Sequence, residues 1–333
     1  MVDISSLKPS VLIRPPKIII YGKNKIGKSD FSSKAPNPVV MDLENGMDSF
    51  LIAKHKVKTF NQALDFMRDL YQQQHDFEYL VVDSADWLEG IMIQELCKTH
   101  DAKTISDKYN KAMSFGNGER MLLNMWKTLL TALDCLNKDK NMGIILIAHN
   151  QIKKFEDPLT ETYDQHSIKL EKKTAEKLKE WADCILFATT KVVIEPEKVG
   201  YGSTVNRGKE VGRVLYTEGR PSFEAGNRFN LPPELPLSWD AFYKNYNKYI
   251  ESLKKLTKDT KDTNKDILIE EIQANTLKEL VTPERLNKIL KDYNLNKLED
   301  MTLCDYNNEY DKLRLEMSTE TNENNFLNNK KIN

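Results

Sequence analysis

Four residues near the start of the chain, Gly22, Gly27, Lys28 and Ser29, follow the spacing G-x-x-x-x-G-K-S. An apolar run at 18–21 precedes them, and the residues that follow predict the start of a helix. In this context the pattern is typical of a phosphate-binding loop (P-loop), whose glycines let several backbone N–H groups point at one phosphate. We expect nucleotide contacts from Gly22, Lys23, Asn24, Lys25, Ile26, Gly27, Lys28, Ser29 and Asp30.

Lys28 and Ser29 are the residue types that handle the phosphates of a nucleotide. The Lys28 ammonium group would reach the β- and γ-phosphates and take part in catalysis, and the Ser29 hydroxyl would bind Mg²⁺. The positive end of the following helix adds to the attraction for an anion. The expected cofactors are therefore ATP and Mg²⁺, and the alternative is a chance glycine turn before a helix.

Asp83 ends an apolar run at 79–82 and is a candidate for the Mg²⁺ site. We expect it at the carboxyl end of a strand beside the P-loop strand, where its carboxylate would hold the Mg²⁺ shell through water. A strand that ends in aspartate is common, so this prediction depends on the P-loop. The predicted metal site consists of Ser29 and Asp83.

Glu44 and His149 each follow another apolar run, at 39–43 and 143–148. Glu44 is the candidate that orients the attacking water, although the nearby Asp42 could share or take this role. His149 is a candidate sensor of the γ-phosphate, and the alternative is an ordinary hydrogen-bonding histidine at a strand end.

These residues need a sheet that brings strand ends together. Apolar runs at 18–21, 39–43, 79–83, 143–149 and 184–194 predict strands, and helical stretches lie between them. Continuously apolar strands indicate a sheet covered on both faces, so the fold class is α/β, with three layers and a mostly parallel sheet. Further expected elements are a short strand at 58–60, helices at 61–74, 87–100, 119–136 and ending near 181, polar loops at 150–167 and 195–211, and a strand at 212–216.

The composition changes near residue 239, where lysine, asparagine and glutamate begin to dominate. We expect a small C-terminal helical appendage after the α/β domain, with helices at 267–280, 283–293 and 301–316. The predicted divisions are a lead-in at 1–13, the P-loop domain at 14–240, a helix or linker at 241–266, the appendage at 267–317 and a disordered tail at 318–333.

The composition as a whole describes a soluble protein. The net charge of −1 gives no global basic field that demands nucleic acid, although a local basic surface is compatible with it. No apolar run reaches the roughly 20 residues needed to cross a bilayer, and the N-terminus lacks a secretory signal. Four scattered cysteines indicate a reducing compartment, so we expect a cytoplasmic protein with no membrane partner.

Several segments together resemble the phage-type RecA-like ATPase family, some members of which act in single-strand annealing or recombination. The segments are YGKNKIGKSDFSSKAPNPVVMDLENGMDSF, FEYLVVDSADWL, GIILIAHNQIKKFEDP and EAGNRFNLP, within residues 14–236. The resemblance implies a RecA-like P-loop NTPase core that binds and hydrolyses ATP, in a phage-infected or prophage-bearing cell.

The resemblance also implies roles for single residues. Glu44 would be the catalytic carboxylate, Asp83 the acid on the magnesium side and His149 the sensor at the strand tip. Arg228 matches a late family motif and would complete the site of a neighbouring subunit in a homo-oligomer, or else make a plain surface contact. Two positions differ from the family, which usually has glycine where Lys25 and Asn45 stand.

Two predicted polar loops are candidate contacts for single-stranded DNA, since RecA-like proteins bind DNA through loops after their strands. Basic side chains with aromatic neighbours suit a nucleic-acid backbone and stacked bases. The candidates are Lys153 and Lys154 in the first loop and Lys198, Tyr201, Arg207 and Lys209 in the second.

Two functions fit these features. The first is an ATP- and Mg²⁺-dependent protein of recombination or annealing that acts on single-stranded DNA, with phage single-strand-binding or replication proteins as possible partners. The second is a nucleotide-dependent switch, such as a helicase loader, that binds a protein partner. A small-molecule kinase is disfavoured because no arginine-rich lid follows the P-loop helix.

Overall fold

The computed structural model describes residues 13–156, 161–199, 203–263, 281–293, 295, 298 and 301, with no account of side chains at 195–199, 203–207 and 256–263. The chain divides into two compact units, and the boundary between them lies at Tyr249 and Ile250. The larger unit contains the P-loop. The predicted segments at 1–12, 267–280 and 302–333 lie outside the described residues.

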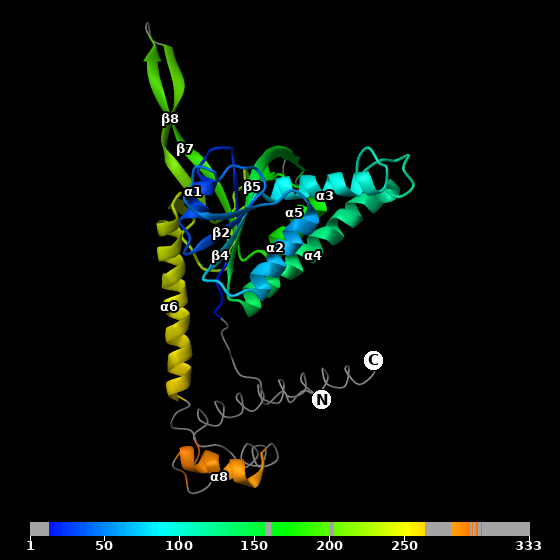
Figure 1. Ribbon diagram of the computed structural model, residues 1–333. Helices are drawn as coiled ribbons and strands as arrows, with labels where there is room; N and C mark the ends of the chain where they lie inside the picture. Colours follow the sequence, from blue (N-terminus) through cyan, green and yellow to red (C-terminus); the bar gives the residue numbers. More distant parts are fainter. Residues whose placement is uncertain are drawn as a thin grey trace. The chain divides into compact units, whose positions relative to one another are not determined.

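The larger unit is built on one sheet, in the order β10-β8-β7-β1-β5-β4-β2-β3, with β6 paired to β5 and β9 to β7 (Figure 1). Strands β7, β1, β5, β4, β2 and β3 run parallel to one another, and β8 and β10 add antiparallel pairs at one edge. The strands are β1 Lys17–Gly22, β2 Pro38–Asp42, β3 Ala53–Lys56, β4 Tyr79–Asp83, β5 Gly143–Phe155, β6 Tyr163–Ile168, β7 Cys184–Val199, β8 Ser203–Tyr216, β9 Gly226–Asn227 and β10 Glu234–Pro236.

Helices cover both faces of this sheet, as Figure 1 shows. Helices α2, α3, α4 and α5 lie on one face, where α2, α3 and α5 each pack against α4 and α2 also contacts α3. On the other face, the Phe31 ring of α1 packs edge-on against Trp239 and Phe242 at the start of α6. The helices are α1 Lys28–Ser33, α2 Phe60–Gln72, α3 Ala85–Thr99, α4 Asn117–Asp139, α5 Lys172–Trp181, α6 Trp239–Thr263 and α8 Pro283–Asp292, with a 3₁₀ turn at Ser114–Gly116.

Both faces of the sheet are buried, which explains why the central strands are apolar at consecutive positions. Ile19, Tyr21 and Leu146 belong to one large buried cluster with side chains of α2 to α5, and side chains at alternate positions point to opposite faces of a sheet. Ile18 and Ile20 are likewise fully buried, on the face that α1 and α6 cover. The predicted α/β class with a three-layer, mostly parallel sheet is therefore confirmed.

Four local predictions are wrong. Residues 58–60 do not form a strand, because the strand lies earlier at Ala53–Lys56 and Thr59 caps the start of α2 by accepting a hydrogen bond from the Gln62 N–H. The region at 150–167 is no plain loop, since β5 continues to Phe155 and pairs antiparallel with β6. The region at 195–211 is a long hairpin of β7 and β8 instead of a loop. The strand of Asp83 is not beside β1, because β5 lies between them.

The described part of the smaller unit contains helix α8 and the end of α6 after Tyr249. Thr282 accepts a hydrogen bond from the Arg285 N–H, and Pro283 occupies the first turn, so both start signals of a helix are present. Its buried Ile289 clusters with Leu298 and Met301. Among the described residues, no helix is both long enough and apolar enough to span a membrane.

Leu133 of α4 tests the contribution of the helical layer. Its side chain is fully buried, so Leu133→Ala should lower the free energy of unfolding by about 2–5 kcal/mol through lost burial and a residual cavity. Urea denaturation followed by tryptophan fluorescence measures the change. Thr128→Ala, on the exposed face of the same helix, is the control. Equal stability of the two variants would contradict the assignment of α4 to the core.

Candidate nucleotide-binding site

The loop between β1 and α1 has the shape that phosphate binding requires. Gly27 caps the start of α1 with a φ of 117°, a conformation that side chains other than glycine rarely adopt. Glycine is required at position 22 for a different reason, because a Cβ there would overlap the backbone oxygen of Ala188 on β7. The first glycine of the motif therefore permits the close approach of two strands, and the second permits the turn.

Lys25 and Asn45, the two departures from the family pattern, both have left-handed backbone, with φ of 60° and 58°. This is the conformation that glycine adopts most easily, so the glycine usual in the family has a physical reason at both positions. A lysine or asparagine can adopt it at a cost of about 1–2 kcal/mol for most residue types and less for asparagine. The P-loop thus keeps its geometry without the additional glycine.

Lys28 is buried within the loop that it serves. Its Nζ donates hydrogen bonds to the backbone oxygens of Gly22 and Lys23, both at 2.9 Å. Burial lowers the pKa of Lys28, while the negative charges of Asp83, Asp86 and Glu44 oppose this shift. The ammonium group is therefore already directed into the loop, where a phosphate would exchange with the carbonyl partners.

Ser29 and Asp83 lie side by side as predicted, although β5 lies between β1, which leads into the P-loop, and β4, which ends at Asp83. The Ser29 hydroxyl donates to Oδ2 of Asp83 at 3.0 Å. Burial raises the pKa of Asp83 to about 6, and the charges of Glu44 and Asp42 add to this effect. Asp42, in register with Asp83, is buried with neither carboxylate oxygen hydrogen-bonded. Such an oxygen-rich, under-satisfied group of side chains fits Mg²⁺, which prefers oxygen ligands.

Glu44 and His149 approach each other across the end of the sheet. His149 Nδ1 lies 2.9 Å from Oδ2 of Asp86 and 3.7 Å from Oε1 of Glu44. The backbone N–H of His149 also donates to Asp86, and the Ser84 hydroxyl donates to Glu44. Ligand atoms of Glu44, Asp86 and His149 lie within 4.8 Å of one another, so they could also hold a metal ion. Because His149 is already engaged by Asp86, this arrangement is better explained as a hydrogen-bonded network.

Asp86 and Ser84 were missed in the sequence. Ser84 follows Asp83 directly and caps α3, and Asp86 lies in the first turn of that helix, where small polar and acidic side chains are favoured. The segment D-S-A-D holds this signal, but it does not reveal that Asp86 would reach a histidine 63 residues away.

A cavity of about 450 Å³ joins these groups. It has the size of a small-ligand site and combines the P-loop with the ends of β2, β4 and β5. Asp42 is buried and is not among the lining residues, whereas Glu44 lines the cavity. The lining consists of Asn24, Lys25, Gly27, Lys28, Ser29, Asp30, Glu44, Gly46, Phe50, Asp83, Ile147 and His149.

Arg228 is not part of this site within one chain. It lies beside β9, which pairs with the beginning of β7, and its guanidinium group contacts Oδ1 of Asp183 at 3.3 Å. The Asp183 N–H bonds to the Lys17 carbonyl, at the amino end of β1, whereas the P-loop follows the carboxyl end. Arg228 therefore lies near the amino ends of the parallel strands, at the end of the sheet opposite the P-loop. It could reach a nucleotide only in another subunit.

The DNA candidates are spread over two hairpins. Lys153 and Lys154 are exposed on β5, where they line a groove of about 420 Å³ that also includes Phe155 and side chains of α5. Lys209 is exposed on β8. Lys198 lies on β7 and Arg207 on β8, and the side chains of both are outside the described part of the chain. Tyr201 is outside the described residues altogether.

Together, the sheet and the loop define a P-loop nucleotide-binding protein. A family model described as an AAA domain matches residues 14–229, well over half of the chain, so the chain belongs to this family. The predicted class of P-loop ATPase is thereby confirmed.

The chain is similar to the crystal structure of the RadB recombinase, with 13% identity, coverage of 68% of this chain and 90% of that chain, and a TM-score of 0.37. A likeness this low carries no functional weight. A comparison with curated proteins finds no match.

The pKa of Asp83 gives a prediction for stability. A folded-state pKa near 6 lies above the ordinary value of 3.8, so the charged carboxylate opposes folding above pH 6 and this penalty disappears as the pH falls toward 4. Without metal, Asp83→Asn should therefore be more stable than wild type by about 2–3 kcal/mol at pH 8 and equally stable near pH 4.

Urea denaturation in EDTA at several pH values measures this difference. Asp65→Asn makes the same charge change at an exposed position of α2 and should show no such pH dependence. A constant difference between wild type and Asp83→Asn across the pH range would show that the Asp83 carboxyl group has its ordinary pKa.

Proposed function

We propose that the protein binds ATP with Mg²⁺ and hydrolyses the γ-phosphate bond. The single observation that carries this proposal is the cavity in which the P-loop lysine, the Ser29–Asp83 pair and Glu44 face the same space. Ser29 and Asp83 would hold Mg²⁺, which when bound neutralises charge on the phosphates. Lys28 would contact the phosphates, since its ammonium group already lies within the loop.

Glu44 is the proposed acceptor of the water proton. The hydrogen bond from Ser84 goes to Oε1, so Oε2 is available to orient a water molecule in the cavity. His149 is held by Asp86 at 2.9 Å and lies beside Glu44, where it would respond to the γ-phosphate through a hydrogen bond. In this scheme Asp86 is a positioning residue, because it acts through His149.

We further propose that single-stranded DNA binds at the β5–β6 hairpin. Lys153 and Lys154 provide positive charge, and the exposed Phe155 ring packs against the half-buried Tyr163 at a centroid distance of 5.4 Å. Basic groups beside aromatic rings suit a phosphate backbone and stacked bases. The same strand bears His149, so DNA on the hairpin would be connected to the nucleotide site through β5.

Assembly into a homo-oligomer would give Arg228 a role. From the opposite edge of the sheet it would approach the nucleotide of a neighbouring subunit, where an arginine stabilises charge on the transferring phosphoryl group. Annealing or recombination in a phage context, with single-strand-binding or replication proteins as partners, is the proposed setting.

A second candidate function is a nucleotide-dependent switch that binds a protein. The β7–β8 hairpin projects from the sheet and exposes Val192, Ile194 and Val211 by 52%, 66% and 62% (Figure 1). Exposed apolar side chains on a projecting hairpin favour a protein contact. DNA-independent hydrolysis and nucleotide-dependent capture of a helicase would support this alternative.

Two variants separate nucleotide binding from hydrolysis. Glu44→Gln should lower the hydrolysis rate about 10²–10⁴-fold and leave the ATP affinity within about threefold, because only the proton acceptor is lost. Lys28→Ala should weaken ATP binding itself. Single-turnover hydrolysis and calorimetric titration measure the two effects. Glu78→Gln, an exposed acid before β4, is the control. Full activity of Glu44→Gln would exclude Glu44 as the water-orienting acid.

The hairpin lysines give a prediction for DNA. Replacing Lys153 and Lys154 by alanine should weaken binding of a single-stranded oligonucleotide and lower the slope of log K against log salt by about 1.4, at about 0.7 for each lost phosphate contact. Fluorescence anisotropy over a salt series measures the slope. The double variant Lys127→Ala and Lys138→Ala, on α4, has the same charge change. Loss of DNA stimulation of hydrolysis only in the hairpin variant would support the proposed coupling, and equal slopes would refute the site.

A further inference from the structure

Arg213 of β8 lies against the P-loop of its own chain. Its Nη1 atom is 3.4 Å from the position that a Cβ of Gly27 would occupy. The motif glycine therefore faces a guanidinium group from a strand that follows it by 186 residues. The sequence pattern gave no indication of this neighbour.

The backbone of Arg213 is fixed on both sides. It is paired with Thr190 on β7, and its carbonyl accepts the Leu237 N–H at 3.1 Å. One position further on, Val214 pairs with Pro236 on β10. The Arg213 side chain thus projects from the firmly paired foot of the hairpin and not from its distal part.

The guanidinium group borders a hollow of about 570 Å³ between the P-loop and the foot of the hairpin. P-loop residues 23–26 form one wall, and residues of β7 and β8 form the other. Asn24 and Lys25 also line the phosphate cavity, so the two spaces border the same part of the P-loop. A nucleotide on the P-loop would have this hollow directly beside it.

Arg213 has no ion pair or side-chain hydrogen bond with any residue in the described part of the chain. Lys23 and Lys25 add positive charge to the same hollow, and Glu210 is the acid that lines it. An exposed arginine without an acidic partner, next to two lysines and a loop of backbone N–H groups, is suited to an anionic ligand.

We propose that Arg213 binds the polyphosphate of the nucleotide held by its own chain. The inference rests on the proposed function and adds to it a cation that no P-loop motif contains. Because Arg213 belongs to the β7–β8 hairpin, a partner bound on that hairpin would be linked directly to nucleotide affinity. Arg228, at the other edge of the sheet, could not provide this contact within one chain.

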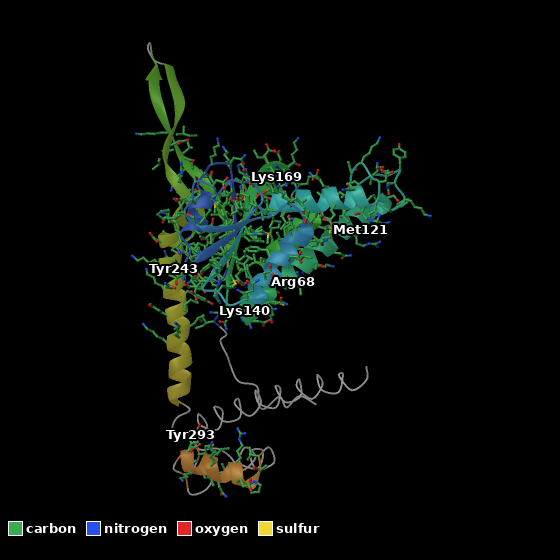
Figure 2. All side chains as sticks on the ribbon, in the orientation of Figure 1. Arg68, Met121, Lys140, Lys169, Tyr243 and Tyr293 are labelled. Carbon is green, nitrogen blue, oxygen red and sulfur yellow. The ribbon has the colours of Figure 1, made fainter. Side chains whose placement is uncertain are left out.

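The test compares binding of Mg·ATP and of Mg·tripolyphosphate by calorimetry for wild type, Arg213→Ala, Arg213→Lys, Arg213→Gln, Lys28→Ala and Arg68→Ala. Arg213→Ala should weaken both ligands by about 10- to 100-fold, the loss expected for a hydrogen bond between charged groups. Arg213→Lys should recover part of the affinity, because it keeps the charge without the bidentate geometry. Arg68, on α2 and labelled in Figure 2, is the matched control and should leave both affinities unchanged.

Each alternative outcome has one meaning. Wild-type affinity of Arg213→Ala, with binding lost in Lys28→Ala, would refute the inference and leave the proposed function intact. If Arg213→Ala binds ATP more weakly but tripolyphosphate as well as wild type does, Arg213 contacts the nucleoside part of ATP, and the polyphosphate contact is refuted. Absence of ATP binding by the wild type would refute the proposed function itself. If Arg213→Ala melts at a lower temperature than wild type, Arg213→Gln, which keeps the side chain as far as Cδ and removes only the charged guanidinium group, decides the question in the same way.

Discussion

The parallel pairing of β1 with β5 on one side and β7 on the other is the constraint on which the site depends. This register places Gly22 opposite His149 and also opposite Ala188. The approach to β7 is so close that a Cβ on Gly22 would overlap the Ala188 oxygen. The P-loop therefore leaves the sheet between a histidine and a strand that continues into a long hairpin. A shift of either strand by one residue would turn each of its side chains to the other face.

Burial of charge is the second consequence of this register. Lys28, Asp83 and Asp42 are at most 5% exposed, and they lie at the carboxyl edge with Glu44 and Asp86. Desolvation lowers the pKa of the lysine and raises that of Asp83, so burial of these charged groups has an electrostatic cost. A cation and a polyphosphate would restore the missing partners. The site thus resembles other functional sites, where under-compensated charges are kept at the expense of stability.

The sequence predicted the parts of the fold that are determined locally. The P-loop, the apolar strands and most helices follow from patterns within about 15 residues, and these were placed within a few residues of their observed bounds. The order of strands depends on contacts between distant segments, so the insertion of β5 between β1 and β4 was not foreseen. The hairpins at 150–168 and 184–216 were partly taken for loops, because polar, exposed strands lack the apolar signal by which buried strands are found.

Within the site, the same distinction holds. Lys28, Ser29, Asp83, Glu44 and His149 were found because each belongs to a motif or ends an apolar run, and they line one cavity. Asp86 and Arg213 reach the site from segments distant in the sequence, and no local pattern encodes this proximity. At two other positions the backbone explains a family preference that this sequence does not follow. At Lys25 and Asn45 the sequence differs from the family, yet the backbone keeps the left-handed conformation that explains the family preference.

The two strands beside β1 have one property in common: both continue past the edge of the sheet as hairpins (Figure 1). β5 passes from His149 to the basic and aromatic residues near Phe155, and β7 passes from Ala188 to the exposed valines. Each hairpin is therefore an uninterrupted extension of a strand that contacts the P-loop strand. A ligand on either hairpin could change the nucleotide site by shifting one paired strand, without a chain of side-chain contacts between them. Because the register with β1 has to be kept, such a change would move a hairpin together with its strand, and β1 lies between the two strands that would move.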